Sequence, residues 1–204
     1  MTRLRTWSAT ALAVALLCCG CSSSGQGAAS SPSPTEPGFT VAPPPTLDPA
    51  AALTKPFTTT LFRPGFSLRL PAAWTAVERD VSAFQAYLGD EDFEITFDHT
   101  YQRHESVAQG VARLSATPGA RPGVVEQVVV GGRRGQAVVL DDDGALQFAD
   151  SGFHVPSGPI VVMVLPVPDG TTLTVFLVTR NDRAVQVPRL RALVDRVFAT
   201  LRWS

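Results

Sequence analysis

Cysteine is nearly absent from this chain, and the few cysteines present are grouped together. Of 204 residues only Cys18, Cys19 and Cys21 are cysteine, and none follows position 21. A domain held by disulfides would carry cysteines throughout its length, and a cysteine nucleophile would have to lie in the folded part. Both are therefore excluded for the chain beyond Cys21.

A strong excess of charge of either sign is also missing. The 17 lysines and arginines are balanced by 18 acidic residues, and Lys55 is the only lysine. Removal of Arg3 and Arg5 with an N-terminal signal would leave 15 basic against 18 acidic residues, a net charge of −3. Binding to nucleic acid requires a basic face, so no nucleic-acid partner is predicted.

Familiar catalytic motifs are missing as well. The sequence has no Gly-x-Ser-x-Gly elbow and no glycine-rich loop that opens a helix. The segment 131–134 (Gly-Gly-Arg-Arg) lies between two predicted strands, so no helix N-terminus is there to hold phosphate. Only three histidines occur, and His154 has no evident carboxylate to orient it. The sequence therefore predicts neither a cofactor nor enzymatic activity.

The N-terminus has the pattern of an export signal. Arg3 and Arg5 precede an apolar run over 9–17, which is shorter than the roughly 20 residues that span a bilayer. The segment resembles a bacterial lipoprotein signal, with cleavage after Gly20 and a diacylglyceryl group on the thiol of Cys21. Cys19 is a second candidate for that thiol, and an ordinary secretory signal is the alternative. We expect residues 1–20 to be the signal peptide and Cys21 to anchor the protein at the outer face of the cell membrane.

Serine and proline dominate the next segment. Residues 21–55 include three consecutive serines, a Ser-Ser-Pro-Ser-Pro run and three consecutive prolines, with Phe39 as the single aromatic. Such a composition cannot bury enough apolar surface to offset its ordering entropy. We expect 21–55 to be a disordered tether, and 56–204 to be a single globular domain.

Hydrophobic periodicity along the predicted domain indicates strands and helices, and the strands are the more numerous. Alternating or continuous apolar runs predict strands over 66–70, 84–88, 93–98, 124–130, 134–140, 160–165 and 172–179. The last four form two hairpins, around Gly131-Gly132 and around 168–170, and the second hairpin is apolar enough to be central.

Two helices are predicted beside these strands. Ser106 and Gln109 have the spacing of a capping box, which opens a helix that should end by Pro118. The C-terminal helix has its apolar residues three, four and seven apart, so one face should pack on a sheet. Those residues are Leu190, Leu193, Val194, Val197, Phe198 and Leu201.

The order of these features resembles a known fold. The sequence Gly-Phe-Ser-Leu-Arg-Leu-Pro at 65–71, Trp74, two antiparallel hairpins and a final helix ending in Leu201-Arg202-Trp203 are similar to the α/β/α sandwich of the PsbP and Mog type. With the signal and tether, the chain resembles the LpqN-type lipoproteins of actinobacteria. The resemblance implies an α+β fold, a mainly antiparallel sheet flanked by helices, and a non-enzymatic accessory or binding role at the cell envelope.

Local sequence offers few ligand-binding candidates. His99 and His104, beside Asp98 and Glu105, are the weak candidates for a metal site, but a spacing of five suits neither a helix face nor a strand face. The acidic run at 141–144 lacks the alternating oxygen ligands of a calcium loop, and a solvated turn is the better interpretation.

The polar loop over 149–159 is the stronger candidate for a binding surface. It carries Phe153, His154 and Val155 among glycine, serine and proline, and recognition often lies on such loops. Our leading hypothesis is a binding module for a protein, a glycolipid or a wall component. A metal-dependent hydrolase using His99 and His104, and a purely structural spacer, are the alternatives.

Overall fold

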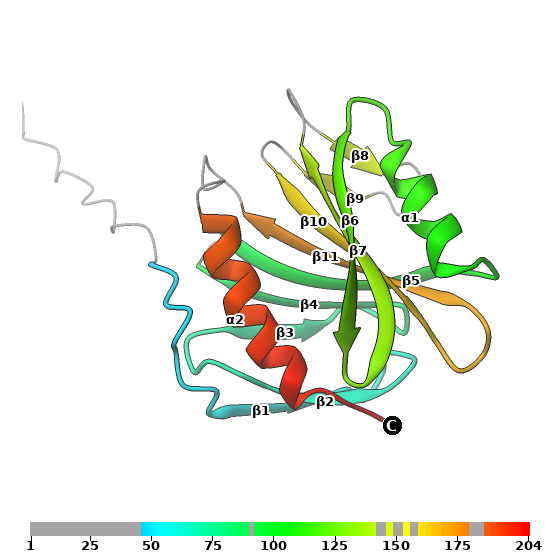
Figure 1. Ribbon diagram of the computed structural model, residues 1–204. Coiled ribbons are helices and arrows are strands. Elements are labelled where there is room, and N and C mark those ends of the chain that lie inside the picture. Colours follow the sequence, from blue (N-terminus) through cyan, green and yellow to red (C-terminus); the bar gives the residue numbers. More distant parts are fainter. Residues whose placement is uncertain (1–45, 90–91, 142–145, 149–152, 156–158, 180–185) are drawn as a thin grey trace, which may run out of the picture. The chain divides into compact units, whose positions relative to one another are not determined.

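The computed structural model describes residues 46–89, 92–141, 146–148, 153–155, 159–179 and 186–204, with the backbone alone for 146, 147 and 153–155. The fold is α+β, a mainly antiparallel arrangement of strands flanked by two helices, as predicted (Figure 1). The helices are α1 (Val107–Ser115) and α2 (Val187–Thr200). The strands are β1 (Lys55–Thr58), β2 (Phe66–Leu70), β3 (Thr75–Glu78), β4 (Ala83–Leu88), β5 (Phe93–Arg103), β6 (Arg121–Val130), β7 (Arg133–Asp141), β8 (Leu146–Phe148), β9 (Phe153–Val155), β10 (Ile160–Pro166), β11 (Thr172–Thr179) and β12 (Arg202–Trp203).

Seven strands form the main sheet, in the order β3-β4-β5-β11-β10-β7-β6. Every neighbouring pair in it is antiparallel. The hairpin β10–β11 lies at the centre and is buried along almost its whole length, which explains its continuous apolar sequence. The sequence prediction of a central hairpin is confirmed.

The two faces of the main sheet bury separate hydrophobic cores. On one face α2 and the small sheet β1-β2-β12 cover residues such as Ile95, Phe97 and Val175. On the other face α1 and Phe148 of β8 cover Val162 and Phe176. The helices therefore belong to opposite layers, and the second layer carries the pocket described below.

The first turns of both helices agree with the sequence. The Ser106 hydroxyl accepts the backbone N–H of Gln109, and the Gln109 side chain accepts the N–H of Ser106, so the predicted capping box is present. Helix α2 buries the predicted apolar stripe, from Leu190 to Phe198, against the first core. Pro188 lies in its first turn, where no intrahelical donor is lost.

The hairpin between β6 and β7 turns on two glycines, as predicted. Gly131 has a φ of 56° and Gly132 a φ of 83°, values that residues with a side chain rarely adopt. A Cβ at Gly131 would lie 2.6 Å from Nε1 of Trp203, whereas a Cβ at Gly132 would meet nothing within 4 Å. Gly131 is therefore required twice, by its conformation and by the close approach of β12.

The folded domain begins earlier than the sequence predicted. Leu47, assigned to the tether, is only 1% exposed and belongs to the first core. The carbonyl groups of Pro49 and Ala51 accept hydrogen bonds of 2.8 and 3.0 Å from Arg196 of α2. The predicted boundary between 55 and 56 is wrong because buried apolar contact and these bonds hold 46–55 on the domain.

Several strands were not predicted. The short strands β1, β3 and β12 were missed, and 153–155, expected within a loop, form β9, which pairs with β8. The acidic turn was expected at 141–144. Asp141 is the last residue of β7, and 142–144 lie outside the described residues. Among the described residues, no helix has the length and apolar character needed to cross a membrane.

Strand β5 alternates as predicted, but its polar side is buried as well. Phe93, Ile95 and Phe97 face the first core. On the opposite side Glu94 is completely buried and accepts hydrogen bonds from Gln85 Nε2 at 2.7 Å and from the hydroxyl of Thr96. The sheet is therefore polar at β4 and β5 and apolar at β10 and β7 on the face that carries α1.

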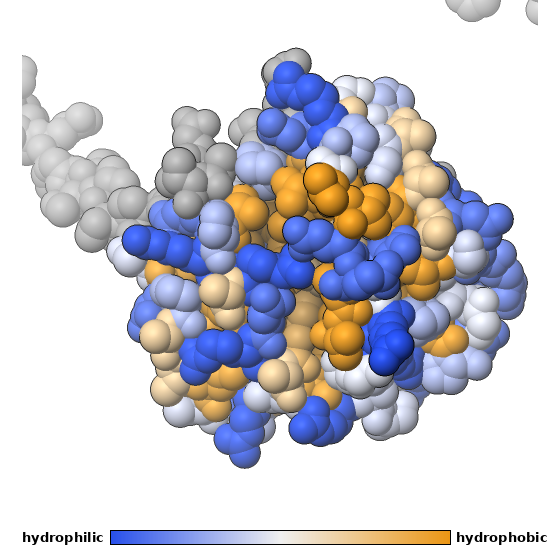
Figure 2. All heavy atoms as spheres, in the orientation of Figure 1, coloured by the Kyte–Doolittle hydropathy of each residue, from blue (hydrophilic) through white to orange (hydrophobic). Residues whose placement is uncertain are grey.

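Strand β6 forms one edge of the main sheet and leaves apolar side chains exposed. Figure 2 shows hydrophobic surface over β6 and β7, interrupted by hydrophilic groups. The exposed apolar residues of these strands are Val124, Val125, Val129 and Val139. The edge also carries Pro122, the exposed Glu126 and a register irregularity, features that discourage pairing with another sheet.

Candidate functional site

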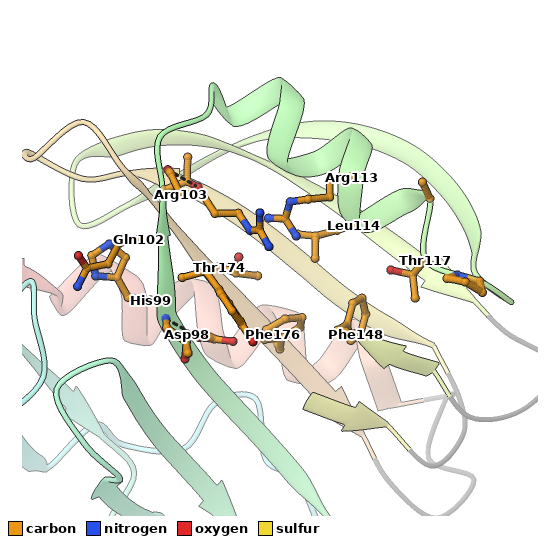
Figure 3. A pocket seen from close by; sticks show the side chains of 15 residues that line it. Asp98, His99, Gln102, Arg103, Arg113, Leu114, Thr117, Phe148, Thr174 and Phe176 are labelled. Atoms are coloured by element: carbon orange, nitrogen blue, oxygen red, sulfur yellow. Dashed lines mark hydrogen bonds between the residues drawn. The ribbon is translucent and has the colours of Figure 1, made fainter. Parts of the chain in front are cut away.

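A pocket of about 180 Å³ lies on the α1 face of the main sheet. Its walls come from the end of β5, from β11, from α1 with the turn after it, and from β8 (Figure 3). Leu114, Phe148 and Phe176 form an apolar part, in which the two phenylalanine rings lie 5.1 Å apart. This pocket combines apolar and charged groups, as ligand-binding sites commonly do.

A bulge in β5 builds one side of the pocket. On β11, Thr174 pairs with Asp98 of β5. Thr172 lies two residues earlier on β11, but it pairs with Arg103, which lies five residues later on β5. Three extra residues are thus accommodated on β5, and Gln102 takes a φ of 40°. Bulges next to functional sites re-aim side chains, and a positive φ at a residue other than glycine is strained. The bulge directs residues 98–103 to line the pocket.

Two arginines from different elements meet at the pocket. Figure 3 shows the side chains of Arg103, from the bulge, and Arg113, from α1, pointing toward each other. Glu105 binds Arg113 through two contacts, 2.7 Å from Nη2 to Oε1 and 3.3 Å from Nε to Oε2. Thr172 adds a hydroxyl bond of 3.3 Å to Glu105 Oε1. The guanidinium group of Arg113 is therefore held in a defined orientation.

The charge of Glu105 is stabilised by this arrangement. Its hydrogen bond with Arg113 is the largest cause of a lowered pKa, and the charge of Arg103 lowers the pKa further, while burial opposes the shift. Glu105 is consequently ionised at neutral pH. The carboxylate of Glu105 thus interacts with both guanidinium groups.

Asp98 and Tyr101 complete the polar surface of the pocket. Asp98 accepts the backbone N–H of Thr100 at 2.8 Å, and Figure 3 shows it apart from the two arginines. The ring of Tyr101 lies 5.2 Å from the guanidinium carbon of Arg103, within cation–π range. The aromatic contact limits the directions that Arg103 can take.

His99, a predicted metal candidate, is committed to structural hydrogen bonds. It is only 4% exposed, and its Nδ1 lies 2.9 Å from the carbonyl oxygen of Arg63, to which it must donate. Its Nε2 lies 2.7 Å from the hydroxyl of Thr171, which in turn lies 2.6 Å from the carboxylate of Asp169. With both ring nitrogens engaged, His99 has no free lone pair for a metal in this conformation.

The surroundings of His99 also act on Asp169. Hydrogen bonds from the side chain and the backbone of Thr171 lower the pKa of Asp169, and the charges of His99 and His104 lower it further. His104 itself is exposed. Within the residues that the structure describes, no group of three or more metal-ligating side chains occurs.

The predicted binding loop lies beside the pocket wall. Phe153, His154 and Val155 form β9, in which Phe153 is opposite Phe148 of β8. Phe148 lines the pocket, so this hairpin belongs to the same region of the molecule. The side chains of 153–155 lie outside the described part of the chain, as does Cys21. Recognition by this segment and lipidation of Cys21 stay predictions.

Sequence reasoning missed the arginine pair. Arg103 and Arg113 are ten residues apart and come together only because the β5 bulge and α1 fold toward one another. The capping box at Ser106 was the one available signal, since it fixed where α1 begins and hence which helix face carries Arg113.

Comparisons with known proteins give structural likeness at low sequence identity. No family model matches the chain. No curated protein matches its sequence either. Similar solved structures include cyanobacterial PsbP (CyanoP) from Synechocystis, with a TM-score of 0.43, 12% identity and coverage of 76% of this chain and 96% of that chain. The Ran-binding protein Mog1p of Saccharomyces cerevisiae has a TM-score of 0.43, 11% identity and coverage of 73% and 95%.

LpqN of Mycobacterium tuberculosis, which is involved in cell envelope biogenesis, is also similar. Its TM-score is 0.39, with 12% identity and coverage of 72% of this chain and 90% of that chain. These three proteins are of the kinds that the sequence resemblance named. At such scores and identities, no conclusion about activity or partner follows from the likeness.

Proposed function

We propose that this chain is a lipid-anchored lipoprotein of the cell envelope whose domain binds a ligand without transforming it. Cys21 attaches the protein to the outer face of the cell membrane, and the domain recognises a protein, a glycolipid or a wall component. The single observation that carries the binding role is the pocket between α1, the β5 bulge, β11 and β8.

The N-terminal sequence supports the anchoring. An apolar run of nine residues follows two arginines and leads directly to Gly20 and Cys21. Two or three acyl chains on that thiol and its amino group would hold the protein stably, since each buried methylene contributes about 0.8 kcal/mol. The serine- and proline-rich segment after Cys21 would let the domain reach ligands above the membrane surface.

The pocket geometry supports binding over catalysis. The bulge places charged groups beside an apolar surface, an arrangement that can orient a ligand. His99 is buried and lies next to the charged residue Asp98 of the pocket. Both of its ring nitrogens form hydrogen bonds, which connect the segment at Arg63 with the turn at Asp169. Its observed bonds give it a structural role.

The anchoring is tested by the mass of the N-terminal peptide. We expect protein purified from the membranes of its own host to begin at Cys21 and to carry the mass of two or three acyl chains. The Cys21→Ala variant should lose that mass and leave the membrane fraction. A processed N-terminus without acyl mass would contradict the anchoring.

The binding role is tested by blocking the pocket. Ala116, exposed at the end of α1, lines the pocket, whereas Ala112, one turn earlier on the same helix, is exposed and does not line it. Native mass spectrometry of the full chain from its host should detect a bound molecule in the wild type and in Ala112→Trp, and far less of it in Ala116→Trp. Equal occupancy in both variants would exclude this pocket as the site.

A further inference from the structure

We propose that the domain docks on anionic lipid headgroups of the membrane that anchors it, through an arginine face made of Arg69, Arg196 and Arg202. This docking rests on the proposed anchoring at Cys21 and adds the surface that meets the membrane and the lipid charge that it selects. It depends on three observations: the clustering of the three arginines, the positive charge of the segments that carry them, and the place where the chain enters the domain.

The three arginines come together where α2 ends against the small sheet β1-β2-β12. Alternate residues of β2 are buried in the first core, so Ser67 and Arg69 face outward. Arg202 of β12 pairs with Ser67, which places it diagonally opposite Arg69, about 7–8 Å away. The backbone N–H of Arg69 donates to the Thr200 hydroxyl at 2.9 Å, and Arg196 lies one turn before Thr200 on α2. The arginine face therefore surrounds the C-terminal end of α2.

The side chains of these arginines keep donors for another partner. Arg196 and Arg202 each donate from Nη1 alone, to backbone carbonyl groups of 49–51 and of the end of α2. Arg69 is exposed, and only its backbone forms the bond described above. In the part of the chain that the structure describes, no carboxylate forms an ion pair with any of the three. The arginine face therefore presents positive charge to the outside.

Positive charge is concentrated on the segments that build this surface. These segments are 46–58, β2, α2 and β12, and their acidic residues are Asp48 and Asp195. Their basic residues are Lys55, Arg69, Arg189, Arg191, Arg196 and Arg202. Six positive and two negative charges leave +4, whereas the rest of the chain after residue 20 has 9 basic against 16 acidic residues, a net charge of −7. An anionic surface therefore attracts this side of the domain and repels the remainder.

The chain from Cys21 enters the domain beside the arginine face. The described chain begins at 46, and Arg196 binds the carbonyl groups of 49–51. Figure 1 shows this segment running alongside α2 before it enters β1. If the 25 residues from 21 to 45 form the predicted tether, they span on average about 25–30 Å. Anchoring at Cys21 thus holds the arginine face near the headgroups at a high effective concentration, so weak contacts suffice.

The strength and the direction of docking follow from this distribution of charge. Each basic residue close to an anionic membrane strengthens binding by about fivefold, so three arginines together contribute roughly a hundredfold. The attraction falls off within about 10 Å at 0.1 M salt. Because α1 and the small sheet cover opposite faces of the main sheet, docking through the arginine face turns α1 and the pocket away from the membrane.

A single fluorescent label measures the docking. The chain has no cysteine after Cys21, whose thiol is blocked by lipid under this proposal, so Thr58→Cys supplies one labelling site. Thr58 is exposed and pairs with Ser67, in the same row as Arg202. The full chain from its host is placed in nanodiscs that carry a quencher on the headgroups. We expect severalfold stronger quenching with phosphatidylglycerol than with phosphatidylcholine alone, and weak quenching with both for a label at Ala112→Cys on α1.

Two matched variants test whether the arginine face is responsible. Arg69→Gln removes a charge whose side chain has no bond in the described structure, so it should weaken docking about fivefold without changing Tm. Arg134→Gln makes the same change at an exposed arginine on the α1 face of β7 and should leave docking unchanged. Raising the salt concentration to 0.5 M should remove the difference between the two lipids. Unchanged docking in Arg69→Gln, or equal quenching on both lipids at low salt, would overturn the inference.

The outcomes separate this inference from the proposed anchoring. If the host protein carries acyl chains but the label at Thr58→Cys does not distinguish the two lipids, the docking fails and the anchoring stands. If the host protein carries no acyl mass, the anchoring fails, and sedimentation of the same chain with phosphatidylglycerol vesicles tests the arginine face alone. Binding that is weakened in the double variant Arg69→Gln/Arg202→Gln would then support the arginine face, and absent or unchanged binding would overturn it.

Discussion

Glu78 holds the segment between β1 and β2 through an unusual set of hydrogen bonds. Its Oε2 accepts the backbone N–H groups of Leu61 and Phe62, each at 2.6 Å, and its Oε1 accepts the N–H of Thr60 at 2.7 Å. Phe62 is fully buried in the first core. One side chain at the end of β3 thus fixes a segment that has no strand or helix of its own.

The substitution Glu78→Gln should be distinctly destabilising. The amide keeps one acceptor oxygen but presents an NH₂ group to backbone donors, so bonds to at least one N–H group are lost. A hydrogen bond to a charged group contributes about 1.5–3 kcal/mol, and partial exposure places this site toward the lower end. We expect a loss of about 2 kcal/mol in the free energy of unfolding, which corresponds to roughly 4–8 °C in Tm for a domain of this size.

Urea unfolding of the full chain, followed by tryptophan fluorescence, measures this loss, since Trp74 is buried. Glu126→Gln is the matched control. The Glu126 side chain is 64% exposed and lies 3.9 Å from Arg191, so its replacement should change stability by less than about 0.5 kcal/mol.

The effect of Glu78 should also depend on pH. Desolvation raises the pKa of Glu78, but the N–H donors of Phe62, Thr60 and Leu61 lower it by more, so it lies below its ordinary value of 4.5. A carboxyl group with a lowered folded pKa stabilises the fold above its ordinary pKa and loses that contribution as the pH falls through the folded pKa. The difference in the free energy of unfolding between wild type and Glu78→Gln should therefore become smaller below about pH 5. A difference in the free energy of unfolding that does not change with pH would refute the reasoning. A loss in Glu78→Gln no larger than the loss in Glu126→Gln would also refute it.

Four further substitutions test other parts of the fold by the same urea assay. Gly131→Ala should cost more than about 2 kcal/mol, because strain at positive φ adds to clashes with Leu201 and Trp203. Gly132→Ala should cost only about 1 kcal/mol of strain, and equal losses would contradict this. Ser106→Ala should cost about 1 kcal/mol through loss of the helix cap, and no loss would show that the capping box contributes nothing. Thr171→Val should cost about 1–3 kcal/mol, because the buried ring of His99 loses its hydroxyl partner, and a neutral effect would contradict a structural role for that histidine.

The parts of the fold that were predicted correctly are those in which local sequence and burial agree. The apolar stripe from Leu190 to Phe198 repeats at helical spacing, and every member is buried in α2. The continuous apolar sequence of 160–165 reflects a strand buried on both faces. In both cases the pattern lies within one element, so no knowledge of its neighbours is needed.

The parts that were missed depend on partners far away in the sequence. Strand β12 has only two residues, and it exists because it pairs with β2. Leu47 is a single apolar residue in a proline-rich stretch, and nothing local shows that the first core receives it. The arginine pair requires three extra residues in β5 opposite β11, and Gln102, at positive φ, is neither the glycine nor the asparagine that would signal such a bulge.

The central claim is that the pocket between α1 and the β5 bulge binds a ligand. The most direct test is an experimental structure of the full chain purified from the membranes of its own host, without added ligand. We expect density for a bound molecule in this pocket, with an apolar part against Phe176. A pocket filled only with water, in protein that still carries its bound molecule elsewhere, would contradict the claim.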